Sequence, residues 1–323
     1  MKAAVLHQLG NLPEYEDFEE PVPANTDEIL INVKASAIKN LDKGRASGKH
    51  YASYKHLPVV VGIDGVGVLQ NGQRVYAQGI TGMFAEKAVI NKNNYVVLPD
   101  NIDDATAAAL PNAVLGAGMA LLYRAQIKKD EVVLINGATG VTGKLAVQLA
   151  KYYGASKIAV TGRNSEQLEQ LRSLGADIII SLKQDDENII QQIKALNAST
   201  PVDIVIDYLW GKPVELILKS LMGGSVNHIS HRVRLVTVGS MAGEHINLES
   251  GTLRSAAIEI SGSGLGSISK EQWHEYRVKV LPEMFQLAAD GKLIIETETE
   301  PLSNIKQAWQ KEAAPGKRIV VMV

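Results

Sequence analysis

The clearest chemical signal in the sequence is a glycine-rich run, Gly137-Ala138-Thr139-Gly140-Val141-Thr142-Gly143. An apolar strand is expected directly before this run, over Glu131–Asn136, and a helix directly after it, over Gly143–Tyr153. Glycines suit such a turn because it is tight, because a pyrophosphate must approach its backbone, and because the helix must pack closely on the strand. The N–H groups that begin the helix then attract the anion. The pattern predicts a dinucleotide-binding turn made by Ala138, Thr139, Gly140, Val141, Thr142 and Gly143. The alternative is an ordinary strand-to-helix turn.

The end of the next expected strand decides which dinucleotide would bind. An NAD site usually carries Asp or Glu about 20 residues after the glycines. Here the chain reads Val160-Thr161-Gly162-Arg163-Asn164-Ser165, with Arg163 at that spacing. Arginine pairs bidentately with phosphate, and a serine adds a hydroxyl donor. We therefore expect NADPH, with its ribose phosphate held by Thr161, Gly162, Arg163 and Ser165. The alternative is a solvated arginine at a strand end.

The expected strands and helices divide the chain into two kinds of domain. Residues 1 to about 100 contain short β-prone runs separated by Gly, Pro and Asn, a pattern typical of an antiparallel sheet or small barrel. Residues 103–125 should be helical, and apolar strands then alternate with amphipathic helices. This alternation predicts a parallel, doubly wound sheet. The six expected strands are Glu131–Asn136, Lys157–Thr161, Asp177–Ser181, Val202–Asp207, Leu235–Val238 and Ile258–Ser261.

The tail after residue 266 contains one long expected helix, Lys270–Ala289, and two expected strands, Leu293–Thr297 and Arg318–Val323. If these strands were added to the six-stranded parallel sheet, that sheet would be unusually large. We therefore expect them to belong to the first domain. The sequence thus predicts an α/β protein with a β-rich domain over 1–121 and 267–323. Residues 122–266 should form the nucleotide-binding domain.

Composition excludes several classes of function. The chain has 323 residues with 33 Lys and Arg against 35 Asp and Glu, so its near-neutral charge does not favour nucleic acid or acidic membranes. The absence of cysteine removes disulfides and sulfur-ligated zinc. The uncharged run Ala105–Tyr123 is expected as a buried helix pair split at Pro111 rather than as a membrane span. The N-terminus lacks the apolar core of a signal peptide, so we expect a cytoplasmic protein.

Several separated segments together resemble the medium-chain dehydrogenase/reductase superfamily, and within it the zinc-free quinone oxidoreductase branch. They extend over essentially the whole chain: Val33–Asp42, Pro58–Gly67, Gly137–Gly143, Leu174–Asp177 and Asp290–Lys292. The resemblance implies a GroES-like β-barrel domain around an inserted Rossmann domain with a six-stranded parallel sheet. It also suggests a homodimer joined through the Rossmann sheets.

The resemblance also bears on metals. Zinc-dependent members have a Cys where this chain has Lys39 and a His where it has Ile63, while Asp64 matches the acidic neighbour of that His. Two ligand positions therefore cannot bind zinc, and we expect no metal. The histidine pair His228 and His231 is expected to be solvated.

In this family the nicotinamide lies between the domains, at the carboxyl ends of the Rossmann strands. The resemblance implies that loops after the last three strands contact it. Each loop residue could instead be a plain loop residue. The implied contacts are Tyr208, Trp210, Val238, Gly239, Ser240, Ser263, Gly264 and Leu265.

The implied reaction is hydride transfer from NADPH to a small-molecule quinone, enone or enal. Without zinc, the developing oxyanion needs hydrogen-bond donors or cations, and we expect Lys39 or Tyr51 to supply them. The alternatives are a lysine paired with Asp42 and a tyrosine that only packs. A Thr common near the nicotinamide is matched by Gly116, which leaves the substrate open. A zinc-free carbonyl or alcohol oxidoreductase, or a non-catalytic NADPH-binding sensor, stays open as well.

Overall fold

The computed structural model describes residues 1–222 and 231–323. The chain forms two compact units, one of Met1–Asn112 with His274–Val323 and one of Ala113–Trp273. The expected domain limits, at 121/122 and 266/267, both fall inside the second unit and stay a prediction. The chain passes between the two units twice. The boundary after Asn112 lies within a continuous helix, α2 (Asp104–Met119), and the boundary after Trp273 lies within α8 (Lys270–Glu275). A continuous helix has no change of composition that could mark such a boundary.

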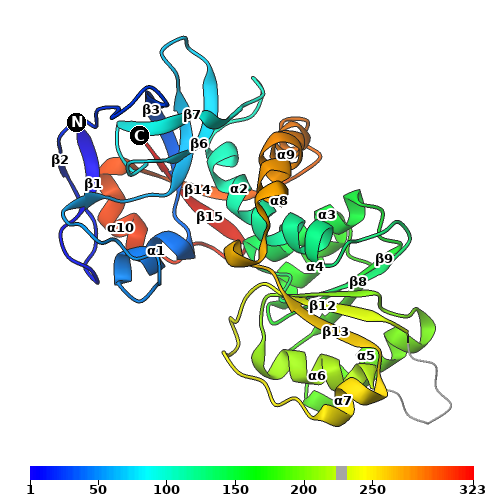
Figure 1. The fold of residues 1–323 in the computed structure, drawn as a ribbon. Coiled ribbons are helices and arrows are strands. Elements are labelled where there is room, and N and C mark those ends of the chain that lie inside the picture. The colour runs from blue at the N-terminus through cyan, green and yellow to red at the C-terminus, as the bar shows by residue number, and fades with distance from the viewer. Residues whose placement is uncertain (223–230) are drawn as a thin grey trace. The chain divides into compact units, whose positions relative to one another are not determined.

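The second unit is built on one six-stranded sheet in which every neighbouring pair is parallel (Figure 1). Its order is β10-β9-β8-β11-β12-β13, which is that of a doubly wound Rossmann sheet. The order reverses between β8 and β11, where such sheets bind ligands beyond the strands' carboxyl ends. The predicted fold class is confirmed. The strands are β8 (Val132–Asn136), β9 (Lys157–Gly162), β10 (Ile178–Ser181), β11 (Ile204–Asp207), β12 (Val233–Thr237) and β13 (Ile258–Gly262).

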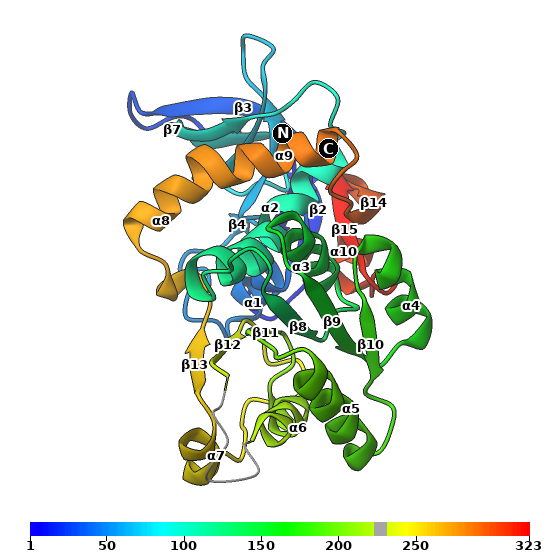
Figure 2. The same ribbon diagram turned by 90° about the vertical axis from the view of Figure 1, so that its right-hand side faces the viewer.

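Helices pack on this sheet because its strands are apolar on both faces. All residues of β8 and β11 are buried. The helices α5 and α6 lie side by side, and their apolar residues join a core cluster with residues of the strands (Figures 1 and 2). The helices of this unit that follow α2 are α3 (Val141–Tyr152), α4 (Ser165–Leu174), α5 (Asp186–Ser199), α6 (Gly211–Leu221) and α7 (Ser250–Ser255).

The first unit contains a closed barrel and a small second sheet. β3 pairs with both β5 and β7, which closes the strand path β3-β5-β6-β7. The tail strands extend this sheet because β15 pairs antiparallel with β3, placing Val320 opposite Ala37. The tail strands therefore lie in the sheet of the first unit, and both termini lie in this unit (Figure 1). The barrel sheet consists of β3 (Glu28–Ala37), β5 (Asp64–Val68), β6 (Arg74–Gly79), β7 (Lys87–Val97), β14 (Glu296–Pro301) and β15 (Lys317–Met322).

The small sheet and the remaining helices complete the first unit. The sheet has the order β2-β1-β4. Ala3, Ala4, Val5 and Leu6 of β1 have no exposed surface, so this strand lies in the core. The remaining elements are β1 (Lys2–Leu6), β2 (Glu14–Asp17), β4 (Val59–Val60), α1 (Asn40–Ser47), α9 (Leu281–Ala289) and α10 (Ile305–Gln310).

The expected split of the Ala-rich segment at Pro111 is wrong. Pro111 lies inside α2, and a π-helical turn, Ala120–Arg124, continues the helix. A proline removes one helical hydrogen bond, while burial of residues such as Leu110 and Val114 favours an unbroken helix. Tyr276 also donates a hydrogen bond of 2.8 Å to the Pro111 carbonyl. The segment Asp104–Arg124 is long and apolar enough to cross a membrane, but 72% of its most apolar window is buried, as in the core helix of a soluble protein.

Two expectations for the tail differ in detail. The helix expected over Lys270–Ala289 forms as α8, a π-helical turn at Tyr276–Val280, and α9. The strand expected over Leu293–Thr297 lies further along the chain as β14. Its pairing with β15 places Thr299 opposite Val320, so the partner strand determines its position more than its own apolar residues do.

Candidate functional site

The turn after β8 uses its three glycines in three different ways. Gly137 has a φ of +84°, and an added Cβ would lie 2.7 Å from Leu209 Cγ. At Gly143 an added Cβ would lie 2.6 Å from the Ala138 Cα, so α3 approaches the turn too closely for any side chain. Gly140, the residue before α3, faces open space. The first N–H groups of a helix have no partner within it. The turn therefore presents donors beside a space that could admit a phosphate.

A buried polar network lies behind this turn, at the ends of three adjacent strands. Asn136, Thr161 and Asp207 have no exposed surface. The Thr161 hydroxyl donates to Asn136 Oδ1, and Asn136 Nδ2 donates to Asp207 Oδ1 at 2.7 Å. Thr161 Oγ1 also accepts the N–H of Gly137 at 3.2 Å. The predicted cofactor residue Thr161 thus uses its hydroxyl inside the protein, where it supports the turn.

Asp207 anchors the loop that follows β11. Its carboxylate accepts the backbone N–H groups of Leu209 at 3.0 Å and Trp210 at 3.1 Å. Burial raises the pKa of Asp207, and these donors together with Asn136 offset part of that rise. Trp210 has a φ of +54°, a conformation costly for a residue other than glycine. Asp207 was missed in the sequence, although a polar residue ending an apolar strand could have indicated it.

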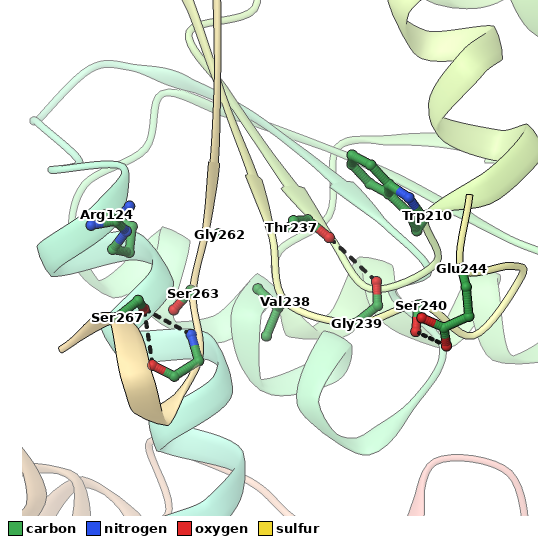
Figure 3. A pocket seen from close by; sticks show the side chains of 11 residues that line it. Arg124, Trp210, Thr237, Val238, Gly239, Ser240, Glu244, Gly262, Ser263 and Ser267 are labelled. Carbon is green, nitrogen blue, oxygen red and sulfur yellow. Dashed lines mark hydrogen bonds between the residues drawn. The ribbon is translucent and has the colours of Figure 1, made fainter. Parts of the chain in front are cut away.

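Six of the predicted cofactor residues line one cavity of about 530 Å³ beyond β12 and β13 (Figure 3). They are Trp210, Val238, Gly239, Ser240, Ser263 and Gly264. Of the eight residues predicted on the loops after the last three parallel strands, two are not part of its lining. Leu265 is 40% exposed, and Tyr208 is buried with its hydroxyl donating to the Gly116 carbonyl at 3.4 Å. Burial raises the pKa of Tyr208, so its phenol stays neutral.

The cavity also has lining residues that sequence reasoning missed. Thr237 directly precedes the predicted Val238, and Ser267 lies two residues after the predicted Leu265, so the loops were found but not their full extent. Arg124 comes from the π-helical turn far upstream and carried no signal in the sequence. The missed residues are Arg124, Thr237, Glu244 and Ser267.

The predicted phosphate cluster lies at the carboxyl end of β9. Arg163 directly follows Gly162, the last residue of that strand, and its side chain is exposed. Within residues 1–222 and 231–323 it makes no hydrogen bond or ion pair. Asn164 caps α4 by accepting the N–H of Gln167 at 3.1 Å, which places Ser165 in the first turn. A free guanidinium beside a helix start suits a phosphate ester.

Lys39, the first predicted oxyanion donor, lies in the first unit and is 2% exposed. Its ammonium donates to Asp64 Oδ1 at 2.8 Å and to the Ala37 carbonyl at 3.0 Å, and lies 3.3 Å from Asp42 Oδ2. Burial alone would lower the pKa of Lys39, but the two carboxylates outweigh it and raise that pKa. The ammonium thus donates two hydrogen bonds and forms an ion pair with each of the two carboxylates. The geometry favours the alternative of a structural, salt-bridged lysine.

Tyr51, the second predicted donor, follows α1 and is 84% exposed. Its ring contacts only His50 among the aromatic residues of the described chain, with 4.2 Å between ring centroids. The ring is not buried, while its contact with His50 is compatible with the alternative of a tyrosine that only packs. Its role as a donor stays a prediction.

No group of three or more possible metal-ligating His, Asp or Glu side chains occurs among residues 1–222 and 231–323. His228 lies outside the described residues. His231 pairs with Asp203 at 2.6 Å.

Comparisons with known proteins agree with this architecture. A family described as zinc-binding dehydrogenase matches residues 141–283. The chain is 37% identical over 180 residues to an NADPH-dependent alkenal/one oxidoreductase of Arabidopsis thaliana, a match covering 50% of this chain but only 46% of that relative. It is 26% identical to a probable NADPH-dependent quinone reductase of Emericella nidulans, covering 96% of each.

Solved structures extend the likeness to the whole fold. The quinone oxidoreductase of Thermus thermophilus, which has also been solved in complex with NADPH, is 26% identical and superposes with a TM-score of 0.79 over 100% of both chains. The sheet order, the glycine turn and these relatives agree with one another. These comparisons support the resemblance of the chain to the medium-chain dehydrogenase/reductase superfamily and, within it, to the quinone oxidoreductase branch.

Proposed function

We propose that the protein is an NADPH-dependent oxidoreductase that reduces quinones or activated alkenes such as enones and enals. The observation that carries this proposal is the free guanidinium of Arg163 at the end of β9, next to the glycine turn. The names of the Arabidopsis and Emericella relatives support both the cofactor and the substrate classes. The test is NADPH oxidation with a panel of quinones, enones, aldehydes and ketones. Turnover of simple carbonyls alone would favour a carbonyl or alcohol oxidoreductase. No turnover of any substrate would favour a non-catalytic NADPH-binding sensor.

The described residues fit NADPH. The open space at Gly140 and the first N–H groups of α3 would hold the pyrophosphate, and Arg163 would hold the ribose phosphate. The cavity beyond β12 and β13 would take the nicotinamide half of the molecule. When bound, NADPH supplies the hydride for the reaction.

The chain's own residues orient the reactants and stabilise charge. Asp207 holds the loop carrying Trp210, so the cavity wall is positioned before a ligand binds. The hydroxyl of Tyr51 is proposed to donate a hydrogen bond to the substrate oxygen as negative charge develops on it. Lys39 is proposed to hold Asp42 and Asp64 in place rather than to contact substrate.

We further propose zinc-independent activity, a homodimer and a cytoplasmic location. The charged ammonium of Lys39 cannot ligate zinc, and the chain has no cysteine. In the described part of the sheet, β13 pairs with β12 alone, so its other edge could pair with a second copy. The location rests on the sequence alone. We expect activity to survive chelators, and about one zinc per chain by elemental analysis would contradict this.

We expect Arg163→Asp to weaken NADPH binding by about 1.5–3 kcal/mol, because it removes a charge-assisted contact and adds a repulsive carboxylate. Arg163→Lys keeps the charge but not the bidentate geometry, so its loss should be smaller. The measurement is the Kd of NADPH and NADH for all three proteins. NADH binding should change little. Equal affinity of the wild type for the two cofactors would contradict the assignment of Arg163.

Two glycine variants separate cofactor binding from folding. Gly140→Ala places a methyl group in open space, so stability should stay within about 0.5 kcal/mol of wild type. NADPH binding should nevertheless weaken at least tenfold if the pyrophosphate passes there. Gly143→Ala creates a clash with Ala138, so both stability and binding should fall. The measurements are urea unfolding and NADPH titration, and unchanged binding in Gly140→Ala would rule out this position for the phosphate.

A further inference from the structure

The cavity beyond β12 and β13 contains a cation that the proposed cofactor site does not use. Arg124 ends the π-helical turn Ala120–Arg124 and lines the cavity. Its side chain is partly buried, and its Nε is fully buried without a hydrogen-bond partner. Within residues 1–222 and 231–323 its guanidinium forms no hydrogen bond or ion pair. Burying a donor without a partner costs free energy that a ligand could recover.

Other partly buried arginines of this chain do have partners. Arg234, whose guanidinium reaches the residue next to Arg124, donates to the Ala125 carbonyl at 2.6 Å and pairs with Glu131. Arg74 pairs with Asp104 and with backbone carbonyls. Glu131 is engaged by Arg234, so it does not neutralise Arg124. The Nε of Arg318 is also buried without a partner, but its Nη2 donates to Asn112 Oδ1 at 3.4 Å, whereas no guanidinium atom of Arg124 has a partner within residues 1–222 and 231–323.

The charges of the cavity lie at opposite ends. Arg124 lies with Ser263 and Ser267 at one end, whereas Trp210, Ser240 and Glu244 lie at the other (Figure 3). Glu244 is held there by the Ser240 hydroxyl at 2.7 Å. An anionic ligand is attracted at the first end and repelled at the second. A planar guanidinium beside hydroxyl groups suits a carboxylate.

The sheet order shows that this anion is not a phosphate of the cofactor. The pyrophosphate would lie at the turn after β8, and the ribose phosphate at Arg163 after β9. The residues around Arg124 follow β13, three strands from β8 and four from β9. Neighbouring strands are about 4.8 Å apart, so these positions are separated by roughly 14 Å and 19 Å. A negative group at Arg124 must come from the substrate.

We propose that Arg124 is a specificity residue that binds an anionic substituent, a carboxylate in the simplest case, on the activated alkene that the enzyme reduces. This inference rests on the proposed function and narrows its substrate class. The alkene takes up one hydride from NADPH and one proton from solvent, and its carboxylate is unchanged. Arg124 contributes binding and orientation through that carboxylate.

The test compares 3-benzoylacrylate, an enone with a carboxylate, with its ethyl ester, which has the same enone without the charge. In Arg124→Met, kcat/KM for the acid should fall about 10–100-fold, as expected for a charge-assisted bidentate contact, while that for the ester stays within twofold. Arg124→Lys should restore part of the loss. Arg254→Met, which removes an exposed charge on α7, serves as the control and should change neither value.

A binding measurement separates the possible failures. The saturated product 3-benzoylpropionate should bind at least tenfold more weakly to Arg124→Met than to wild type, followed by tryptophan fluorescence. The inference would be overturned if Arg124→Met lowered kcat/KM equally for the acid and the ester, lowered it for neither, or bound NADPH tenfold more weakly. In each of these cases, reduction of the ester by the wild type would still support the proposed function. Failure of the wild type to reduce any enone or quinone, with product binding still dependent on Arg124, would instead refute the proposed function.

Discussion

Replacing Lys39 by methionine is expected to lower the free energy of unfolding by about 3–5 kcal/mol. Methionine keeps most of the volume and the apolar stem but removes the ammonium that faces Asp64 and Asp42. Those carboxylates are 6% and 0% exposed, so the variant leaves two buried negative charges uncompensated. Urea unfolding of the full chain measures the loss. Normal stability with a hundredfold fall in turnover would show instead that the ammonium acts on substrate.

Two further variants make the Lys39 test specific. Lys34→Met removes an exposed charge from β3 of the same unit and should change stability by less than about 0.5 kcal/mol. The double variant Lys39→Met with Asp64→Leu removes one of the two uncompensated carboxylates. It should recover part of the loss, because an apolar replacement of a buried ion pair often costs little.

The stability loss in Lys39→Met should depend on pH with a definite sign. Burial raises the pKa of Asp42, and the charge of Lys39 opposes this rise. Without Lys39 the folded-state pKa rises further above the unfolded value, so protonation stabilises the variant as the pH falls. The difference between the variant and the wild type should therefore shrink on acidification. A difference that grows as the pH falls would contradict the ion-pair interpretation.

The nucleotide-binding unit could be predicted because its signals are local. The strands of that sheet are short apolar runs connected by helices, so their parallel direction follows from the chain connectivity. The glycine turn could be predicted for the same reason, since strand, turn and helix are consecutive. The positions of Arg163 and Trp210 then follow from the strands that precede them.

The parts that could not be predicted depend on contacts between distant segments. Closure of the barrel requires β3 to pair with β7, some 50 or more residues away, which no local pattern encodes. Arg124 lines the cavity together with loops that lie more than 100 residues further along the chain. Lys39 shows the same limit, since its neighbour Asp42 was visible in the sequence but its bond to Asp64 needed the folded barrel.

Removal of the Asp207 carboxylate is the second substitution for which we expect a large loss of stability. Asp207→Ala is expected to lower the free energy of unfolding by about 3–4 kcal/mol, because it removes the acceptor of three donors at once. These are the N–H groups of Leu209 and Trp210 and the side-chain amide of Asn136. The variant should also bind NADPH more weakly, because Trp210 would leave its costly backbone conformation and the cavity wall would move.

The matched variants for Asp207 separate charge from hydrogen bonding. Asp207→Asn keeps one acceptor but turns a donor toward the Trp210 N–H, so its loss should fall between those of wild type and alanine. Asp186→Asn breaks only an exposed ion pair with Lys212 and should cost about 0.5 kcal/mol or less. Because burial raises the pKa of Asp207, the wild type should gain stability relative to Asp207→Asn, which does not titrate, as the pH falls toward the ordinary carboxylate value of 3.8. If Asp207→Ala unfolds at the wild-type urea concentration, the network does not hold the Trp210 loop, and the cavity must be positioned by the packing of Trp210 alone.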